Sequence, residues 1–83
     1  MTVFKKGRAM ALSITIAPAG NGWAVQSPDL DQDQVFASGS RAEAFGRDLA
    51  AYAAREGEHV ELRIMLRDGT LAATLPFGRA QAA

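Results

Sequence analysis

The chain has 83 residues, 48% of them apolar, and its nine Lys and Arg balance nine Asp and Glu. That length fits one small globular domain with a single core, which leaves little depth for an enclosed active site and disfavours most enzymes. A formal net charge of zero lacks the clustered positive charge that usually marks proteins binding nucleic acids or membranes. The chain contains no cysteine, which excludes disulfides and thiolate chemistry.

Residues 1–11 differ in composition from the rest of the chain. They carry three basic residues without an apolar period: Lys5, Lys6 and Arg8. We therefore predict a flexible basic arm that ends where apolar alternation begins, with Met10 as an alternative start of the chain.

The same region also has the order of a secretory signal peptide. Basic residues precede an apolar stretch from Met10 to Ile16, and small residues follow at Ala17 to Ala19. Apolar and polar residues alternate from Leu12 to Ile16, which is typical of a strand, whereas a signal core is apolar all round. We favour the strand.

Since no apolar run approaches the ~18 residues of a membrane span, we expect a cytoplasmic protein with no membrane partner.

The following residues predict a β-hairpin and a short third strand. A strand from Leu12 to Pro18 is followed by Gly20-Asn21-Gly22, whose residues tolerate positive φ, and then by a return strand from Trp23 to Gln26. An acidic loop over 27–33 leads to the third strand at 34–37. The register of the hairpin places one apolar set on a single buried face: Ile14, Ile16, Trp23 and Val25.

A helix is predicted next. Ser40 and Glu43 have the spacing of a capping box, so we expect the helix to begin there and to run to Glu56. Gly57 is suited to end it in the left-handed conformation. Apolar positions recur at intervals of three and four and mark the stripe expected to be buried: Ala42, Phe45, Leu49, Tyr52 and Ala53.

The last predicted element is a second hairpin. His59 to Arg67 alternates without a fault, and Asp68-Gly69 predicts a two-residue type I′ turn into a strand over 70–75. Pro76 is expected to end that strand, and residues 78–83 to form a frayed tail. A two-residue turn implies three apolar pairs across the hairpin: Leu62 with Leu75, Ile64 with Ala73 and Leu66 with Leu71.

Together these elements predict an α+β two-layer sandwich in the order β-β-β-α-β-β, spanning residues 12–77 as one domain. One helix should cover one face of a mostly antiparallel sheet. A right-handed helical crossover should return the fourth strand parallel to the third, with strand order 3-2-1-4-5.

His59 is the only imidazole in the chain, at the expected start of a strand. It is a conceivable general base, but no recognisable motif places a nucleophile beside it, and we favour a solvated histidine at a strand end. One histidine and no cysteine cannot fill a four-ligand zinc site. We therefore predict no catalytic residue and no cofactor.

Asp29, Asp31 and Asp33 have the spacing that opens a calcium loop. Such a loop needs Gly at its sixth position and a bidentate Glu at its twelfth, where this chain has Gln34 and Ser40. A weak surface cation site is the alternative to a solvated acidic loop, and we favour the loop and predict no metal.

The sheet face turned away from the helix is the predicted binding surface. We expect Met65, Ala72 and Ala24 to form a modest apolar centre within a polar rim, which suits a protein partner or a second copy of the chain. Exposed edge strands offer binding by strand addition. The alternative is association with a nucleic acid through Arg63, Arg67 and the basic arm. The candidate binding residues are His59, Arg63, Met65, Arg67, Ala72 and Thr74.

The stretch Ile14 to Phe77 resembles a bacterial family known as domain of unknown function 2188. Ile16-Ala17-Pro18, Gly22-Trp23-Ala24-Val25 and Arg67-Asp68-Gly69-Thr70-Leu71 carry the resemblance. These are turn and core residues, so the resemblance implies the fold and no activity.

A second set of residues is similar to HicB-type antitoxin domains: Ser27-Pro28-Asp29-Leu30 and Gly39-Ser40, followed by Glu43-Ala44. That family neutralises a small RNA-cleaving toxin. The resemblance therefore implies an antitoxin component as an alternative function. Our leading expectation is a non-enzymatic binding or accessory domain.

Overall fold

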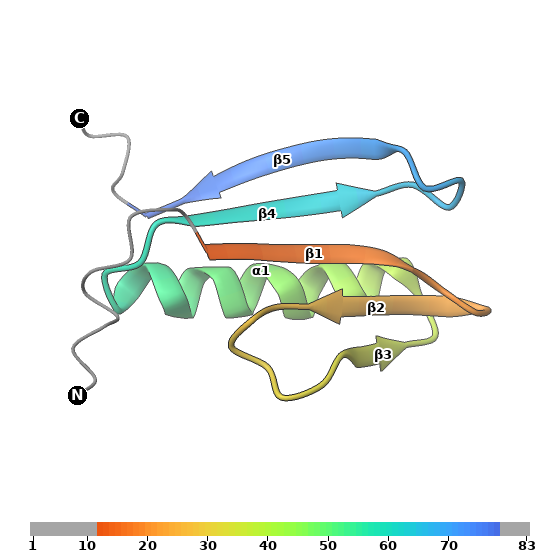
Figure 1. Ribbon diagram of the computed structural model, residues 1–83, viewed down its shortest axis with the longest axis horizontal. Coiled ribbons are helices and arrows are strands. Elements are labelled where there is room, and N and C mark those ends of the chain that lie inside the picture. The colour runs from red at the N-terminus through yellow and green to blue at the C-terminus, as the bar shows by residue number, and fades with distance from the viewer. Residues whose placement is uncertain (1–11, 79–83) are drawn as a thin grey trace.

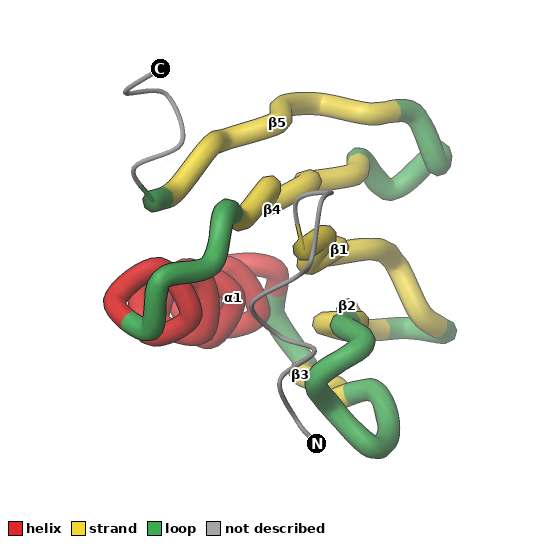
Figure 2. The backbone as a smooth tube through the Cα atoms, turned by 60° about the vertical axis from the view of Figure 1, so that its left-hand side comes forward, coloured by secondary structure: helices red, strands yellow, loops and turns green. Residues whose placement is uncertain are grey.

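A computed structural model describes residues 12–78 as five strands and one helix (Figure 1). The elements are β1 (Leu12–Ala19), β2 (Gly22–Gln26), β3 (Gln34–Phe36), α1 (Gly39–Arg55), β4 (Val60–Met65) and β5 (Leu71–Phe77). They form one sheet in the order β3-β2-β1-β4-β5, in which β1 and β4 are parallel and the other neighbours antiparallel. The helix lies on one side of the sheet (Figure 2). The predicted α+β architecture and strand order are confirmed, while the predicted basic arm and residues 79–83 of the predicted tail lie outside the described residues.

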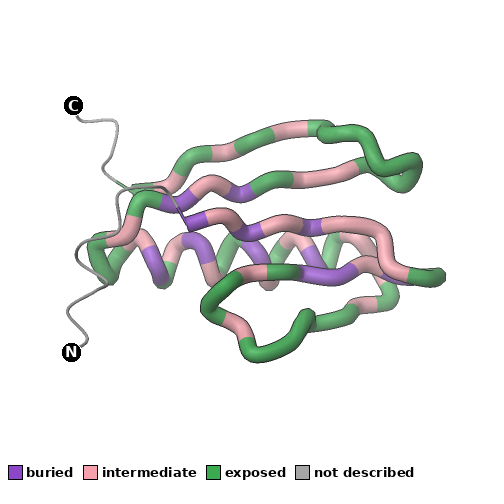
Figure 3. The backbone as a smooth tube through the Cα atoms, in the orientation of Figure 1, coloured by how far each residue is buried: buried purple, intermediate pink, exposed green. Residues whose placement is uncertain are grey.

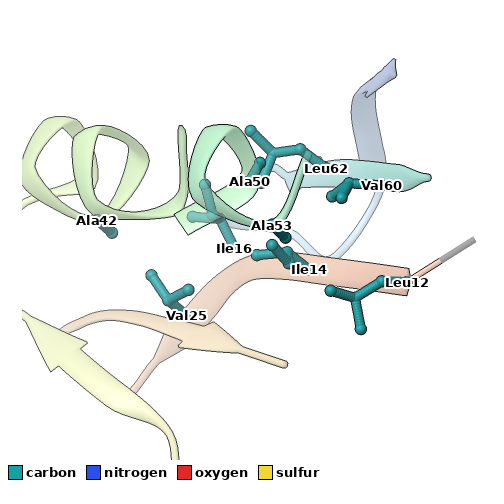
Figure 4. Close-up of a cluster of buried hydrophobic side chains, with 9 residues drawn as sticks. All are labelled: Leu12, Ile14, Ile16, Val25, Ala42, Ala50, Ala53, Val60 and Leu62. Carbon is teal, nitrogen blue, oxygen red and sulfur yellow. The ribbon is translucent and has the colours of Figure 1, made fainter. Parts of the chain in front are cut away.

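The sheet face that meets α1, here called the inner face, carries the buried core. Val25 is paired with Ile16 and Trp23 with Pro18, so the predicted register of the first hairpin is confirmed. Buried positions alternate along β1 and β4 (Figure 3). Burying each large apolar side chain stabilises the fold by about 1.5–3 kcal/mol. Figure 4 shows the cluster that results: Leu12, Ile14, Ile16, Val25, Ala42, Ala50, Ala53, Val60 and Leu62.

The start of α1 differs from the prediction. Ser38, not Ser40, is the N-cap: its backbone is extended, and its hydroxyl accepts a hydrogen bond of 3.2 Å from the Arg41 N–H. Ser40 is already inside the first turn, where a side chain cannot occupy the capping position. The Glu43 carboxylate accepts from Arg47 Nε at 2.9 Å instead of closing a capping box. The predicted capping box is therefore wrong.

The buried stripe of α1 consists of small residues. Tyr52, predicted to be buried, is 56% exposed, whereas Gly46 and Ala50 are buried. A Cβ atom at Gly46 would lie 2.9 Å from Cδ1 of Ile16 and 3.3 Å from Cδ1 of Leu62. The helix therefore approaches the sheet closely along this line, and the larger side chains Phe45 and Leu49 pack at its flank.

The end of α1 matches the prediction. Gly57 has φ of 96°, and its N–H donates to the carbonyl of Ala54 at 3.0 Å. The N–H of Glu58 donates to the carbonyl of Ala53 at 3.0 Å. These two bonds form a Schellman motif, which ends the helix and directs the chain into β4. Among the described residues, no helix is long and apolar enough to cross a membrane.

The turn of the second hairpin is not the predicted type I′ turn. Gly69 has φ of 91°, but no non-glycine residue among 12–78 has positive φ, so Asp68 cannot take the conformation that a type I′ turn needs. Leu66 N–H donates to the Thr70 carbonyl at 2.7 Å, and Gly69 N–H donates to the Leu66 carbonyl at 2.8 Å. The loop therefore has three residues, 67–69, with the glycine alone in the left-handed region.

One unpaired residue restores the predicted register farther from the loop. Met65 is paired with Leu71, but Ile64 is paired with Ala73, so Ala72 has no partner on β4. The pairs of Ile64 with Ala73 and of Leu62 with Leu75 are confirmed, whereas the pair of Leu66 with Leu71 is wrong. The extra residue in the loop and the irregularity at Ala72 compensate each other.

Strand β5 lies at the edge of the sheet, and only part of its inner face is covered. Leu66 and Leu71, predicted to lie in the core, are 50% and 52% exposed. Pro76 does not end the strand; it is paired with Glu61, and β5 continues to Phe77. An edge strand accepts proline because one side of its backbone needs no ladder hydrogen bond.

Candidate functional site

The face of the sheet turned away from α1, here called the open face, carries an unbroken row of apolar residues. Ala24 is the register partner of both Val35 and Ala17, and Met65 is the partner of Leu71. Ala17 and Met65 are neighbours because they directly follow Ile16 and Ile64, which lie side by side. Residues paired across strands share a face. This apolar row crosses all five strands: Val35, Ala24, Ala17, Met65 and Leu71.

The apolar row is unevenly exposed. Ala24 is only 2% exposed, and its neighbour Ala17 is small and half-buried. Met65 and Leu71 are larger, and Leu71 is 52% exposed. Val35 stands at the far edge and is 66% exposed. The accessible apolar surface of the row therefore lies mainly on β3, β4 and β5.

A second row crosses the open face two residues along β1, β2 and β4, and three residues along β5 because Ala72 is unpaired. Thr15 is the register partner of both Gln26 and Arg63, and Arg63 is the partner of Thr74. The Gln26 amide donates to the Asp33 carboxylate at 3.3 Å, which extends the row toward β3. This polar row therefore consists of Asp33, Gln26, Thr15, Arg63 and Thr74.

The charges of the polar row lie on opposite sides of β1. Arg63 lies on β4, and its Nε atom is 3.6 Å from the Glu61 carboxylate. Both side chains are close to half exposed, so this ion pair contributes little to stability and leaves the guanidinium accessible. Asp33 lies on the β2 and β3 side.

A shallow hollow opens on the β2 side of the polar row. Its volume is ≈ 320 Å³ and it is wide open to solvent. It offers hydroxyl and amide groups together with one carboxylate, that of Asp33, which suits a cationic or hydrogen-bond-donating group. Its lining residues are Ser13, Thr15, Gln26, Ser27, Pro28 and Asp33.

The candidate binding residues are only partly brought together. Arg63, Met65 and Thr74 lie in the two rows as expected. Ala72 is exposed at the irregularity next to Leu71. His59 is exposed just before β4, where its carbonyl accepts the Leu12 N–H at 2.7 Å, so it lies at one end of the sheet and away from the apolar row.

Arg67 does not project from the open face. Its guanidinium carbon lies 4.5 Å from the centre of the Trp23 ring, and Nη1 donates to the Gly20 carbonyl at 3.1 Å. The indole of Trp23 also lies against the first residue of α1, Gly39. The three-residue loop removes Arg67 from strand alternation, so the residue links the tips of the two hairpins instead of lying in the predicted binding surface.

Sequence reasoning missed three members of the apolar row: Ala17, Val35 and Leu71. Alternation along their strands contains the signal for Ala17 and Val35, since each lies next to a residue of the inner face. Leu71 has no such signal, because it reaches the open face only through the unpaired Ala72.

The acidic loop is held by short-range hydrogen bonds. The Asp29 backbone N–H donates to the Ser27 hydroxyl at 3.1 Å, and the Asp33 carboxylate accepts from the Gln26 amide at 3.3 Å. Within residues 12–78, no group of three or more His, Asp and Glu side chains is placed to hold a metal ion.

The pKa of Asp68, in the second hairpin loop, is lowered mainly because its carboxylate accepts a hydrogen bond from the Thr70 N–H, and secondly because it accepts one from the Thr70 hydroxyl.

Negative charge predominates in the part of the chain that the structure describes. Residues 12–78 include nine Asp and Glu but five Arg, whereas Lys5, Lys6, Arg8 and Arg79 lie outside. Of the arginines proposed for phosphate contact, Arg63 lies near Glu61, and Arg67 stacks on the ring of Trp23. Nucleic-acid binding would thus rest mainly on residues outside this region.

Comparison of the chain with family models, with curated proteins and with solved structures found no match. The resemblances to domain of unknown function 2188 and to HicB-type antitoxins therefore stay predictions.

Proposed function

We propose that this chain is a small, non-enzymatic protein-binding domain that contacts its partner through the open face of its sheet. The observation that carries the proposal is the apolar row, which runs from Val35 to Leu71 without a polar interruption. Except for Ala24, which is buried, the residues of this row lie outside the cluster that α1 covers. An apolar band bordered by polar residues is the arrangement found in protein interfaces.

The open face is a better binding surface than either sheet edge. Strand β3 has three residues, which is short for strand addition. Strand β5 is longer, but it carries the unpaired Ala72 and Pro76. Both features are ways in which natural sheets prevent edge pairing. Binding across the face needs no free backbone hydrogen-bonding groups.

A protein partner is also favoured over a nucleic acid by the excess of carboxylates among residues 12–78. An antitoxin component, which the weaker resemblance implies, would be one form of the same protein-binding function. A location in the cytoplasm is part of this proposal.

Site-specific photo-crosslinking tests the proposal. A benzophenone amino acid replaces Met65 in the apolar row, and in a matched control it replaces Asp48, which is exposed on α1. We expect a protein adduct from the Met65 position and none from the Asp48 position when the chain is irradiated in its native cells. Absence of an adduct from Met65, or equal adducts from both positions, would contradict the proposal.

A further inference from the structure

We infer that the partner of the open face is a second copy of this chain, packed face to face about a two-fold axis that runs along β1. This inference rests on the proposed function, since it requires the open face to be a binding surface. Three features support it: the central place of β1, the sizes of the side chains along the apolar row, and the position of charge in the polar row.

The sheet has two strands on each side of β1. A two-fold axis along β1, midway between two facing sheets, places β4 of one copy over β2 of the other and β5 over β3. Each residue keeps its level along the strands, so the apolar row covers the apolar row and the polar row covers the polar row. Such an interface is isologous, with the same surface used twice.

Side-chain sizes are complementary under this symmetry. Met65 of one copy stands opposite Ala24 of the other, so a large residue faces a small one. Leu71 stands opposite Val35, and Ala17 stands opposite its own copy. Facing sheets pack about 10 Å apart, a gap that a large side chain opposite an alanine can fill.

Charge is complementary under the same symmetry. Arg63, on β4, stands opposite Gln26 on β2 of the second copy and beside the hollow that Asp33 lines. The guanidinium can donate to the Gln26 side-chain oxygen and to the Asp33 carboxylate. The hollow of ≈ 320 Å³ provides room for that side chain, and the symmetry repeats the contact twice. Glu61 lies off the axis on β4 and does not meet its own copy.

Another two-fold arrangement fits less well. An axis along the apolar row would place Met65 against Met65 and Ala24 against Ala24, so that large residues face large ones and small residues face small ones. It would also separate Arg63 from the hollow of the second copy. The axis along β1 is therefore the one that both side-chain size and charge favour.

Sedimentation equilibrium of the full chain tests the inference. We expect a monomer–dimer equilibrium in which Arg63→Glu and Asp33→Arg each raise the dissociation constant about tenfold or more. The double variant should recover most of the lost affinity, because the reversed charges meet across the two-fold axis. Arg41→Glu, a charge reversal at an exposed position of α1, is the matched control and should leave the constant unchanged. The urea midpoint of each variant checks that it is folded.

Three results would overturn the inference: a monomer at every concentration, a dimer insensitive to Arg63→Glu and Met65→Lys, or a double variant no tighter than the single ones. The crosslinking experiment separates this failure from failure of the proposed function. An adduct of twice the chain mass supports both, whereas an adduct of another mass supports the function and rejects the second copy. With no adduct from the Met65 position, both fail.

Discussion

The two faces of this sheet are built from the same strands but differ in almost every property. Ile14, Ile16 and Leu62 point to the inner face and are at most 1% exposed. The residues between them, such as Thr15 and Arg63, point to the open face and stay in contact with solvent. Since alternate residues are independent, folding constrains one set and leaves the other available for binding. The apolar row is thus a feature that the stability of the monomer does not explain.

The largest expected effect comes from comparing an inner-face residue with an open-face residue on the same strand, β4. Leu62→Ala should lower the free energy of unfolding by about 3 kcal/mol, because it removes a fully buried side chain and leaves a cavity beneath α1. Met65→Ala, three residues away on the open face, should change it by less than about 1 kcal/mol. Urea unfolding of both variants under conditions that keep the chain monomeric measures the difference. Equal losses would mean that the open face belongs to the core.

The start of α1 offers a finer comparison, because it holds the helix on the inner face. Ser38→Ala should cost about 1 kcal/mol, since the Arg41 N–H loses its acceptor. Ser40→Ala, inside the first turn, should change stability by no more than about 0.5 kcal/mol. Thermal unfolding of the pair decides which serine caps the helix; a larger loss at Ser40 would restore the original prediction.

Arg67 tests whether the hairpin tips belong to the folded body or to the open face. Arg67→Ala should lower stability by about 0.5–1 kcal/mol, because it removes the stack on Trp23 and the bond to the Gly20 carbonyl. Trp23 is the only tryptophan, so its fluorescence should shift in the same variant. The dimer dissociation constant should stay unchanged. A weakened dimer with unaltered fluorescence would return Arg67 to the binding surface.

The smallest effect concerns pH. Hydrogen bonds from Thr70 lower the pKa of Asp68 in the folded chain below the ordinary value of 3.8. The stabilisation is therefore complete above that value and is lost as pH falls through the lowered pKa. The Thr70 amide resonance should report the change, and Asp68→Asn should remove it. A titration of Thr70 centred above 3.8 would show that the carboxylate is not held in this way.

Alternation was enough to predict most of the fold. The registers of Ile16 with Val25 and of Leu62 with Leu75 follow from placing one apolar set on one face. Gly57 ends the helix as expected, because only glycine enters the left-handed region there without strain. These predictions depend on short-range chemistry or on a strict period, and both are readable from residue types.

The failures share a different cause. Ser38 and Ser40 are equally good caps by residue type, and the choice depends on where β3 ends. Asp68-Gly69 suits a two-residue turn, but the chain uses three residues and bonds Asp68 to Thr70. In each case two local solutions were available, and the distant packing of the strands selected one.

The candidate site, like the fold, was predictable where the chain forms regular strand and not where it forms the loop. Arg63, Met65 and Thr74 lie in regular strand and reach the open face as alternation requires. Arg67 follows the regular strand and lies against Trp23 instead. Residue type identified the chemistry in both cases, whereas orientation was predictable only within the regular part of β4.

The unpaired Ala72 changes the face of the sheet to which its neighbour Leu71 points. Strict alternation would turn Leu71 toward the inner face with Ala73, at the end of β5 that α1 does not cover, and would leave an apolar side chain in water. One additional residue rotates it next to Met65, where it completes the apolar row. Insertions and deletions in a hairpin can therefore create or erase an adhesive surface in one mutational step, while the core beneath is untouched. For a domain of this size, the evolution of new partners has a route that does not pass through loss of folding.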